Sequence, residues 1–205
     1  MTDGYGRKIE YLRMSVTDAC NLKCVYCMPP DGMKECPCRQ AMSADEFVEI
    51  ARAAAGLGMK KLRITGGEPL VRGDIVPLVR RLGEIPGIED MSLTTNATLL
   101  APMARELYEA GIHRINISLD TLNAEKYEKI TRGGRLADAL DGIRAALEAG
   151  MSPVKLNTVL IGGFNDDEIE ALAALTMRCP VQLRFIELMP IGDTKGEFSA
   201  DAYLP

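Results

Sequence analysis

Residues 12–27 read LRMSVTDACNLKCVYC and join an alternating, strand-like segment to three closely spaced cysteines. Leu12–Thr17 alternates apolar with polar side chains, which is typical of a β-strand. Cys20, Cys24 and Cys27 follow with three and then two residues between them. Thiolates hold iron–sulfur clusters, and three of them leave one metal of a four-iron cluster open for another ligand. The spacing therefore favours an iron–sulfur cluster.

Zinc is the alternative metal for these cysteines, because cysteine sulfur also binds zinc. A structural zinc site needs a fourth ligand, which Cys36 or Cys38 can supply, whereas His113, the only histidine, lies far away in the sequence. The simplest interpretation of Cys36, Cys38 and Cys179 is that they are thiols without a metal. The spacing of the trio alone leaves both metals open.

The composition is that of an ordinary globular protein, with 47% hydrophobic and 26% charged residues among 205. We see no linker or short repeat and expect one domain over residues 1–205. The net charge of −5 argues against nucleic acid and anionic membrane as partners. No apolar run approaches the roughly 20 residues that span a bilayer, and Met1–Glu10 lacks an apolar signal segment. Six cysteines without secretion signals indicate a reducing compartment, so we expect the cytoplasm.

Strand-like and helix-like segments alternate along the chain. The expected strands are Leu12–Thr17, Lys61–Thr65, Met91–Thr95, Arg114–Leu119, Val154–Leu160 and Val181–Glu187. The expected helices are Ser43–Leu57, Asp74–Leu82, Leu100–Ala110, Arg135–Ala149 and Glu168–Arg178. Such alternation predicts an α/β fold with parallel strands and right-handed crossovers. We expect a partial (βα)6 TIM-type barrel in which the helix after the last strand is missing.

Two local signals mark the starts and ends of several of these helices. Ser43 precedes Glu46 by three residues, which is the pattern of a capping box at a helix start. Gly58, Gly111 and Gly150 follow helical stretches, where glycine tolerates the left-handed conformation that ends a helix.

One phase of each predicted strand is polar, although the interior of a closed barrel is usually packed with branched apolar residues. The polar phase consists of Arg13, Ser15, Thr17, Arg63, Thr65, Ser92, Thr94, Asn96, Asn116, Ser118, Asp120, Lys155 and Asn157. Alternate residues of a strand point to the same face, and the apolar phase suits packing under helices. The polar phase then faces the interior, which predicts an open barrel with a polar lumen.

Three residues of this phase are cations, on three different strands of an acidic protein. Arg13, Arg63 and Lys155 converging on one cavity favour a polyanionic substrate such as a nucleoside triphosphate. The alternative is that each pairs with a carboxylate on a neighbouring strand. Arg184 and Glu187 lie in opposite phases of the last strand, so the sequence does not place both inward.

Gly66–Pro69 (GGEP) follows the second strand, at the end where parallel barrels bind ligands. Two glycines allow a close approach of a ligand to the backbone, although an ordinary strand–helix turn is also possible. The segment has no lysine at the spacing of a phosphate-binding loop. Met189, at the end of the last strand, is either core filler or part of a pocket rim.

Taken together, these motifs resemble the radical S-adenosylmethionine superfamily and, more closely, the GTP 3′,8-cyclases (molybdenum cofactor biosynthesis protein A). The resemblance runs from about Arg7 to about Gly192. It is carried by Leu12–Asp18 (LRMSVTD), Arg63–Leu70 (RITGGEPL), Thr94–Asn96 (TTN), Asn116–Asp120 (NISLD), Lys155–Val159 (KLNTV) and Arg184–Met189 (RFIELM).

The resemblance implies a function and its site residues. Cys20, Cys24 and Cys27 would hold a [4Fe-4S] cluster whose open iron binds S-adenosylmethionine, and cleavage of that cofactor would give a 5′-deoxyadenosyl radical. The radical would take hydrogen from the ribose of GTP, whose sugar carbon then attacks C8 of guanine. The implied contacts with S-adenosylmethionine are Tyr26, Gly67, Ser118 and Met189. The implied contacts with GTP are Arg13, Arg63, Thr94 and Lys155.

Proteins of this family continue past the matched region with a second cysteine-bound cluster that holds guanine, nearby arginines and a Gly-Gly C-terminus. None of these precedes Pro205, so we expect a fragment or a shortened relative. The resemblance also implies an electron donor such as flavodoxin or ferredoxin, a downstream cyclic pyranopterin monophosphate synthase and a possible homodimer. The alternatives are another radical S-adenosylmethionine enzyme, of the peptide maturase or deazapurine synthase type, and a zinc-binding interaction module.

Overall fold

The computed structural model of the protein describes residues 2–29, 42–189 and 202–204. Its sheet contains six parallel strands in the order β1-β2-β3-β4-β5-β6. The strands are β1 (Tyr11–Ser15), β2 (Lys61–Thr65), β3 (Asp90–Thr95), β4 (Ile112–Ser118), β5 (Val154–Leu160) and β6 (Val181–Glu187). The first and last strands do not pair with each other, so the sheet is an open, partial barrel.

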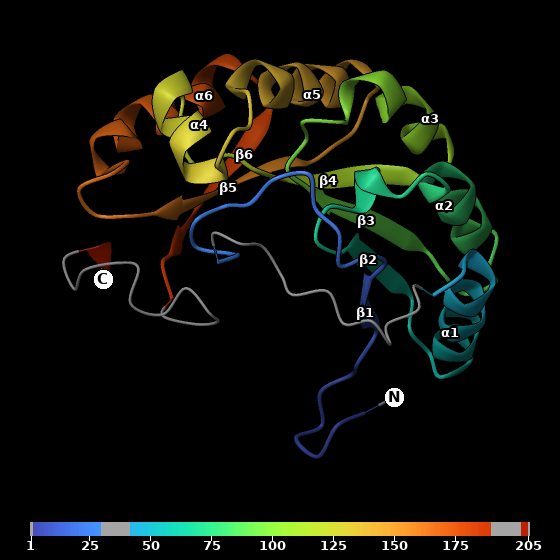
Figure 1. Ribbon diagram of the computed structural model, residues 1–205. Helices are drawn as coiled ribbons and strands as arrows, with labels where there is room; N and C mark the ends of the chain where they lie inside the picture. Colours follow the sequence, from blue (N-terminus) through green and yellow to red (C-terminus); the bar gives the residue numbers. More distant parts are fainter. Residues whose placement is uncertain (1, 30–41, 190–201, 205) are drawn as a thin grey trace.

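The helices line the convex side of the curved sheet (Figure 1). They are α1 (Ala44–Gly56), α2 (Ile75–Gly83), α3 (Ala104–Glu109), α4 (Ala124–Thr131), α5 (Leu136–Glu148) and α6 (Ile169–Arg178). Short 3₁₀ turns lie at η1 (Pro69–Val71), η2 (Ala101–Met103) and η3 (Asp166–Glu168). The predicted α/β class and partial TIM-type barrel are confirmed. The expected absence of a helix after β6 concerns residues 190–201, which lie outside the described residues.

Helix α4 is an addition to the five connecting helices that the sequence predicts. It starts after Asn123, whose side chain accepts hydrogen bonds from the N–H groups of Glu125 and Lys126. Its apolar face is narrow, because Tyr127 and Ile130 are the large side chains that it buries. A mostly polar helix of eight residues gives a weak periodic signal, so the Asn123 cap is the clearest sign of this helix in the sequence.

The core lies between the sheet and these helices. The apolar phase of the central strands is fully buried there, at Leu62, Ile64, Leu93, Ile115, Ile117 and Leu156. Truncating such a leucine to alanine costs about 2–5 kcal/mol in folding free energy. Burial of this phase against helices turns the polar phase to the concave side of the sheet.

The predicted helix boundaries are confirmed where cap chemistry defines them. The Ser43 hydroxyl accepts from the N–H of Glu46, and the Glu46 carboxylate accepts from the N–H of Ser43 at 2.7 Å. Gly58, Gly111 and Gly150 have φ values of 91°, 114° and 91°, in the left-handed region. Among the described helices, none combines the length and the apolar character needed to cross a membrane.

Candidate cofactor and substrate site

The three cysteines lie on a segment that crosses the carboxyl ends of the strands. We call residues 20–28 the cysteine loop. It continues from β1 and runs across the sheet to α4 (Figure 1). The N–H of Lys23 donates to the carbonyl of Thr131 at 3.1 Å, and the N–H of Val25 donates to Ile130 at 2.9 Å. The last carbonyls of a helix lack partners within the helix, and here the cysteine loop supplies two of the missing donors.

Arg132 joins an internal residue of the cysteine loop to its last residue. Its backbone takes the left-handed conformation at the end of α4, with φ 55°. One nitrogen of its guanidinium donates to the carbonyls of Lys23, at 3.2 Å, and Met28, at 2.7 Å. Within the loop, the N–H groups of Cys27 and Met28 both donate to the carbonyl of Cys24. This part of the loop is therefore a compact turn.

The three thiols share an environment that opposes ionisation. Burial raises the pKa of Cys20 and Cys27 above the ordinary value. Burial, the charge of Asp120 and the other two thiols raise the pKa of Cys24 to about 12. Thiolates are the ligand form, so a positive metal centre is what would favour three of them here. The Sγ atom of Cys20 accepts from the N–H of Leu22 at 3.4 Å.

The described residues do not form a ready-made site for a single metal ion. Among residues 2–29, 42–189 and 202–204, no three His, Cys, Asp or Glu side chains are placed to share one metal ion. In a four-iron cluster each thiolate binds a different iron, so the ligands are spread more widely. The zinc alternative relied on Cys36 and Cys38, which lie outside the described residues. Cys179 directly follows α6 and precedes β6, at the opposite end of the strands.

The two glycines of the GGEP turn allow the backbone just before the cysteine loop to pass close to this turn. A Cβ atom on Gly67 would lie 2.4 Å from the carbonyl oxygen of Ala19, and one on Gly66 would lie 2.6 Å from that of Thr17. The N–H of Gly67 donates to Thr17, and the N–H of Glu68 donates to Ala19. The close approach at these glycines is made by the chain's own backbone, which sets the position of the segment leading into Cys20.

Glu68 connects this turn to the end of β3 through hydrogen bonds. Sequence reasoning did not assign it a separate role. Its side chain is 1% exposed. One carboxylate oxygen accepts from the Thr95 hydroxyl at 2.7 Å and from the N–H of Leu70, and the other accepts from the N–H of Asn96. Burial raises the pKa of Glu68 despite these hydrogen bonds. Its signal in the sequence was the GGEP motif itself.

Strand register places the predicted polar phase on one continuous face. Arg13 lies opposite Arg63, and Thr94, Asn116 and Lys155 are neighbours on β3, β4 and β5. Several buried polar atoms of this face have no hydrogen-bond partner among the described residues, namely Arg63 Nε, Ser92 Oγ, Thr94 Oγ1, Asn116 Oδ1 and Asn157 Oδ1. An unpaired buried polar group is costly, so this face is suited to water or a polar ligand.

Within the described residues, the three predicted cations of this face are not neutralised by neighbouring carboxylates. In the part of the chain that the structure describes, no carboxylate forms an ion pair with Arg13, Arg63 or Lys155. Arg114, on the same face of β4, is paired with Asp90. The alternative of cross-strand ion pairs for the three predicted cations is therefore not supported.

The register also resolves the last strand. Arg184 lies opposite Asn157 and so faces the same concave side, whereas Glu187 belongs to the other phase. Burial and then the charges of Arg184, Arg114 and Arg63 lower the pKa of Lys155 on the same face. Arg184 is thus a further cation of the face.

The residues implied as contacts of S-adenosylmethionine come together at the carboxyl ends of the strands. Gly67 follows β2, Ser118 ends β4, and Met189, 57% exposed, follows β6. Tyr26 lies within the cysteine loop, and its hydroxyl donates to Asp120 at 2.6 Å. The Tyr26 side chain packs against a small apolar cluster that includes Ile130.

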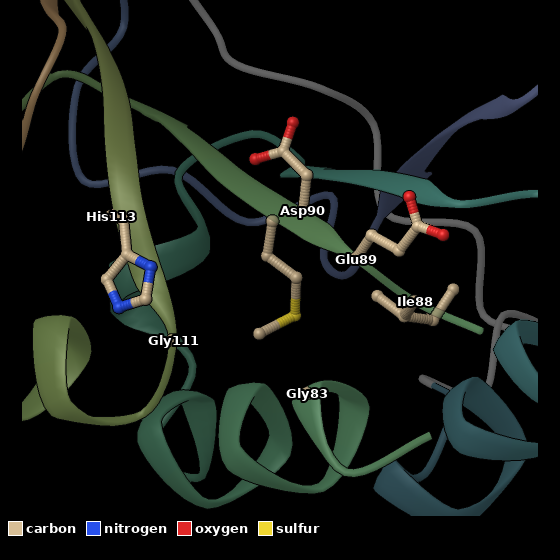
Figure 2. Close-up of a pocket in the computed structure, with 7 residues that line it drawn as sticks. Gly83, Ile88, Glu89, Asp90, Gly111 and His113 are labelled. Atoms are coloured by element: carbon tan, nitrogen blue, oxygen red, sulfur yellow. The ribbon is translucent and has the colours of Figure 1, made fainter. Parts of the chain in front are cut away.

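A separate pocket of about 170 Å³ lies at the other end of the sheet, beside the start of β3 and β4 (Figure 2). Its lining includes Glu89, Asp90 and His113. Asp90 is bound by Arg114, and Glu89 is paired with Lys60. None of the predicted site residues lines this pocket, so the concave face and the cysteine loop remain the candidate site.

Comparison with known proteins gives two kinds of relatives. GTP 3′,8-cyclase of Pelotomaculum thermopropionicum is 55% identical over 205 residues, which are 100% of this chain and 63% of that protein. GTP 3′,8-cyclase of Peptoclostridium acidaminophilum is 57% identical over 190 residues, or 93% of this chain and 58% of that protein. The chain therefore spans about three fifths of the length of these relatives.

The fold is shared with Streptococcus suis SuiB bound to S-adenosylmethionine, with a TM-score of 0.72 and 21% identity over 91% of this chain and 42% of that one. The radical SAM superfamily matches residues 14–176, which include the end of β1, the cysteine trio, the GGEP turn and the four strands β2 to β5. This chain is a member of the radical SAM superfamily, similar in sequence to the GTP 3′,8-cyclases.

Proposed function

We propose that this chain is the radical core of a GTP 3′,8-cyclase, a lyase that makes (8S)-3′,8-cyclo-7,8-dihydroguanosine 5′-triphosphate for molybdenum cofactor biosynthesis. The observation that carries the proposal is the concave face itself: cations without carboxylate partners in the described ranges lie on the strands whose ends bear the cysteine loop. The identity of 55% to a GTP 3′,8-cyclase supports the same substrate.

The cysteine loop and the strand ends have distinct tasks in this proposal. The thiolates of Cys20, Cys24 and Cys27 hold a [4Fe-4S] cluster, and the fourth iron is left for S-adenosylmethionine. When bound, these two groups supply a 5′-deoxyadenosyl radical that abstracts hydrogen from the substrate. The residues assigned to S-adenosylmethionine are Tyr26, Gly67, Ser118 and Met189.

The concave face binds the triphosphate. Arg13, Arg63 and Lys155 make charge-assisted hydrogen bonds to phosphate oxygens, which are among the stronger protein hydrogen bonds. Thr94 Oγ1, which is buried without a hydrogen-bond partner among the described residues, contacts the same ligand. Arg184 adds a fourth cation from β6. Burial and then repulsion by Arg184, Arg114 and Arg63 lower the pKa of Lys155, and a polyanion bound here offsets the repulsion.

The setting of the reaction follows from the same chemistry. Residues 1–205 form one radical SAM core domain that works in the cytoplasm, where the thiols stay reduced. A low-potential donor such as flavodoxin or ferredoxin supplies the electron, and cyclic pyranopterin monophosphate synthase consumes the product. The protein acts as a monomer or a homodimer, and guanine is read by residues that the longer relatives carry beyond the matched region.

Stimulation of cofactor cleavage by substrate tests this proposal. The anaerobically reconstituted, reduced protein should form 5′-deoxyadenosine slowly from S-adenosylmethionine, and added GTP should change that rate. Liquid chromatography of the products measures both. An intact, reducible cluster without any 5′-deoxyadenosine contradicts the enzyme assignment, and cleavage that is indifferent to GTP contradicts the substrate.

A further inference from the structure

Asp120, two residues beyond β4, uses both oxygens of a buried carboxylate. The side chain is 5% exposed. One oxygen accepts a hydrogen bond from the Tyr26 hydroxyl at 2.6 Å, and the other accepts from the N–H of Val159 at 2.8 Å. The first bond reaches into the cysteine loop and the second reaches β5. Asp120 therefore joins two segments that are far apart in the sequence.

The backbone of Asp120 is held in place independently of this carboxylate. The side-chain amide of Asn165, which is fully buried, donates to the carbonyls of Asp120 at 2.7 Å and Val159 at 2.9 Å. The Thr158 hydroxyl donates to the carbonyl of Leu119 at 2.6 Å. These bonds fix the backbone position, at the ends of β4 and β5, from which the Asp120 side chain extends.

The environment of Asp120 is unfavourable for a residue that serves stability alone. In the described ranges no lysine or arginine pairs with it, so its only compensation is hydrogen bonding. A buried carboxylate without a cation is costly, and an apolar residue would cost less. Such groups are concentrated at functional sites, where position matters more than stability.

The two partners of Asp120 belong to the two halves of the candidate site. Tyr26 stands between Cys24 and Cys27, and a hydrogen bond at its hydroxyl fixes the loop between those two thiols. Val159 lies four residues after Lys155 on the same strand and in the same phase. We infer that Asp120 is a positioning residue that sets the cysteine loop, and hence the cofactors it holds, relative to the substrate face of β5.

This inference rests on the proposed cluster and not on the choice of GTP as substrate. Its test therefore uses cluster properties in the reconstituted 205-residue chain. Tyr26→Phe removes the hydroxyl and keeps the packed ring, whereas Asp120→Asn keeps the shape and removes the charge. Thr121→Val is the matched control, because the buried Thr121 hydroxyl, next to Asp120 in the sequence, donates to Glu168 at 2.6 Å and accepts from the N–H of Asn123, both outside the cysteine loop.

Three measurements distinguish positioning from general stability. Both Tyr26→Phe and Asp120→Asn should reconstitute with wild-type iron content but lose iron to a chelator about tenfold faster. The change that S-adenosylmethionine produces in the electron paramagnetic resonance spectrum of the reduced cluster should be weaker or broader in both. Thr121→Val should lower the thermal midpoint by a similar amount and leave both cluster properties unchanged.

The double variant Tyr26→Phe/Asp120→Asn should be no worse than the more severe single variant, because both changes remove the charge-assisted hydrogen bond between the Tyr26 hydroxyl and the Asp120 carboxylate. Wild-type iron release and spectra in both single variants would overturn the inference, and so would equal effects from Thr121→Val. Absence of a cluster from the wild-type chain would instead remove the proposed function on which the inference rests.

Discussion

The guanidinium of Arg63 lies over the ring of Tyr11, with its central carbon 5.3 Å from the ring centroid. The two residues are on adjacent strands, and the buried Nε atom of Arg63 has no hydrogen-bond partner in the part of the chain that the structure describes. The aromatic ring therefore directs a cation on the concave face while leaving its donors available. Contacts of this kind contribute about 0.5–2 kcal/mol, depending on how well water is excluded.

We predict that Tyr11→Ala weakens GTP binding and that Tyr11→Phe does not. Loss of the stacked ring frees the Arg63 side chain, and the expected loss is about threefold to tenfold in affinity. Isothermal titration calorimetry of the anaerobic protein with GTP measures the difference. An equal effect of both variants would show that the hydroxyl, and not the ring face, is what matters.

Lys155 should contribute more to the same affinity. Truncation in Lys155→Ala removes a charge-assisted contact worth about 1.5–3 kcal/mol, which corresponds to roughly tenfold to a hundredfold weaker GTP binding. Cleavage of S-adenosylmethionine should change much less. ATP should compete with GTP for these cations, because both nucleotides carry a triphosphate. A strong preference for GTP would show that residues of the concave face read the base.

The pH dependence of triphosphate binding follows from the lowered pKa of Lys155. A lysine with a lowered pKa loses its charge as the pH rises through that lowered value. Affinity for the triphosphate should therefore begin to fall at a lower pH than it would if Lys155 had the pKa of an ordinary lysine. Lys155→Arg keeps its charge throughout this range and should bind with little change up to alkaline pH. Parallel pH profiles of the two proteins would contradict the prediction.

The order of the strands was predictable from the regular alternation of strands and helices along the chain. The nature of their two faces was predictable because period-two alternation, as in Arg63–Thr65 or Asn116–Ser118, is a local signal. The contacts of Asp120 and Glu68 were not, because each joins segments that only the fold brings together. Helix α4 was missed since its buried stripe is short. The structure shows the backbone of Ala19 close to Gly67, and the contact of Gly67 with S-adenosylmethionine that the resemblance implies stays a prediction.

The close approach at Gly67 leads to a prediction about the cysteine loop. In Gly67→Ala the new Cβ atom would lie 2.4 Å from the Ala19 oxygen, so the segment before Cys20 must shift. Iron content after reconstitution should fall by at least half, a change of order 1 kcal/mol in cluster retention. Gly73→Ala is the control, because a Cβ atom there meets nothing within 4 Å. Full iron retention combined with lost cofactor binding would assign Gly67 to the ligand instead.

The cysteine assignment predicts about one four-iron cluster per chain after anaerobic reconstitution. Changing Cys20, Cys24 or Cys27 to alanine should abolish it, and changing Cys36 and Cys38 together should leave the iron content nearly intact. Iron and sulfide analysis with visible absorption provides the measurement. A colourless protein with stoichiometric zinc, or an equal need for Cys36 and Cys38, would show that the ligand set is different.

The most direct measurement is the transfer of deuterium from GTP labelled at C3′ of the ribose. The reduced, reconstituted protein is incubated with S-adenosylmethionine and labelled GTP, and the 5′-deoxyadenosine is analysed by mass spectrometry. A radical core that binds GTP on its cationic concave face should place deuterium in the 5′-deoxyadenosine, and Lys155→Ala should reduce that incorporation at subsaturating GTP. Formation of 5′-deoxyadenosine without deuterium at saturating GTP would contradict GTP as the substrate.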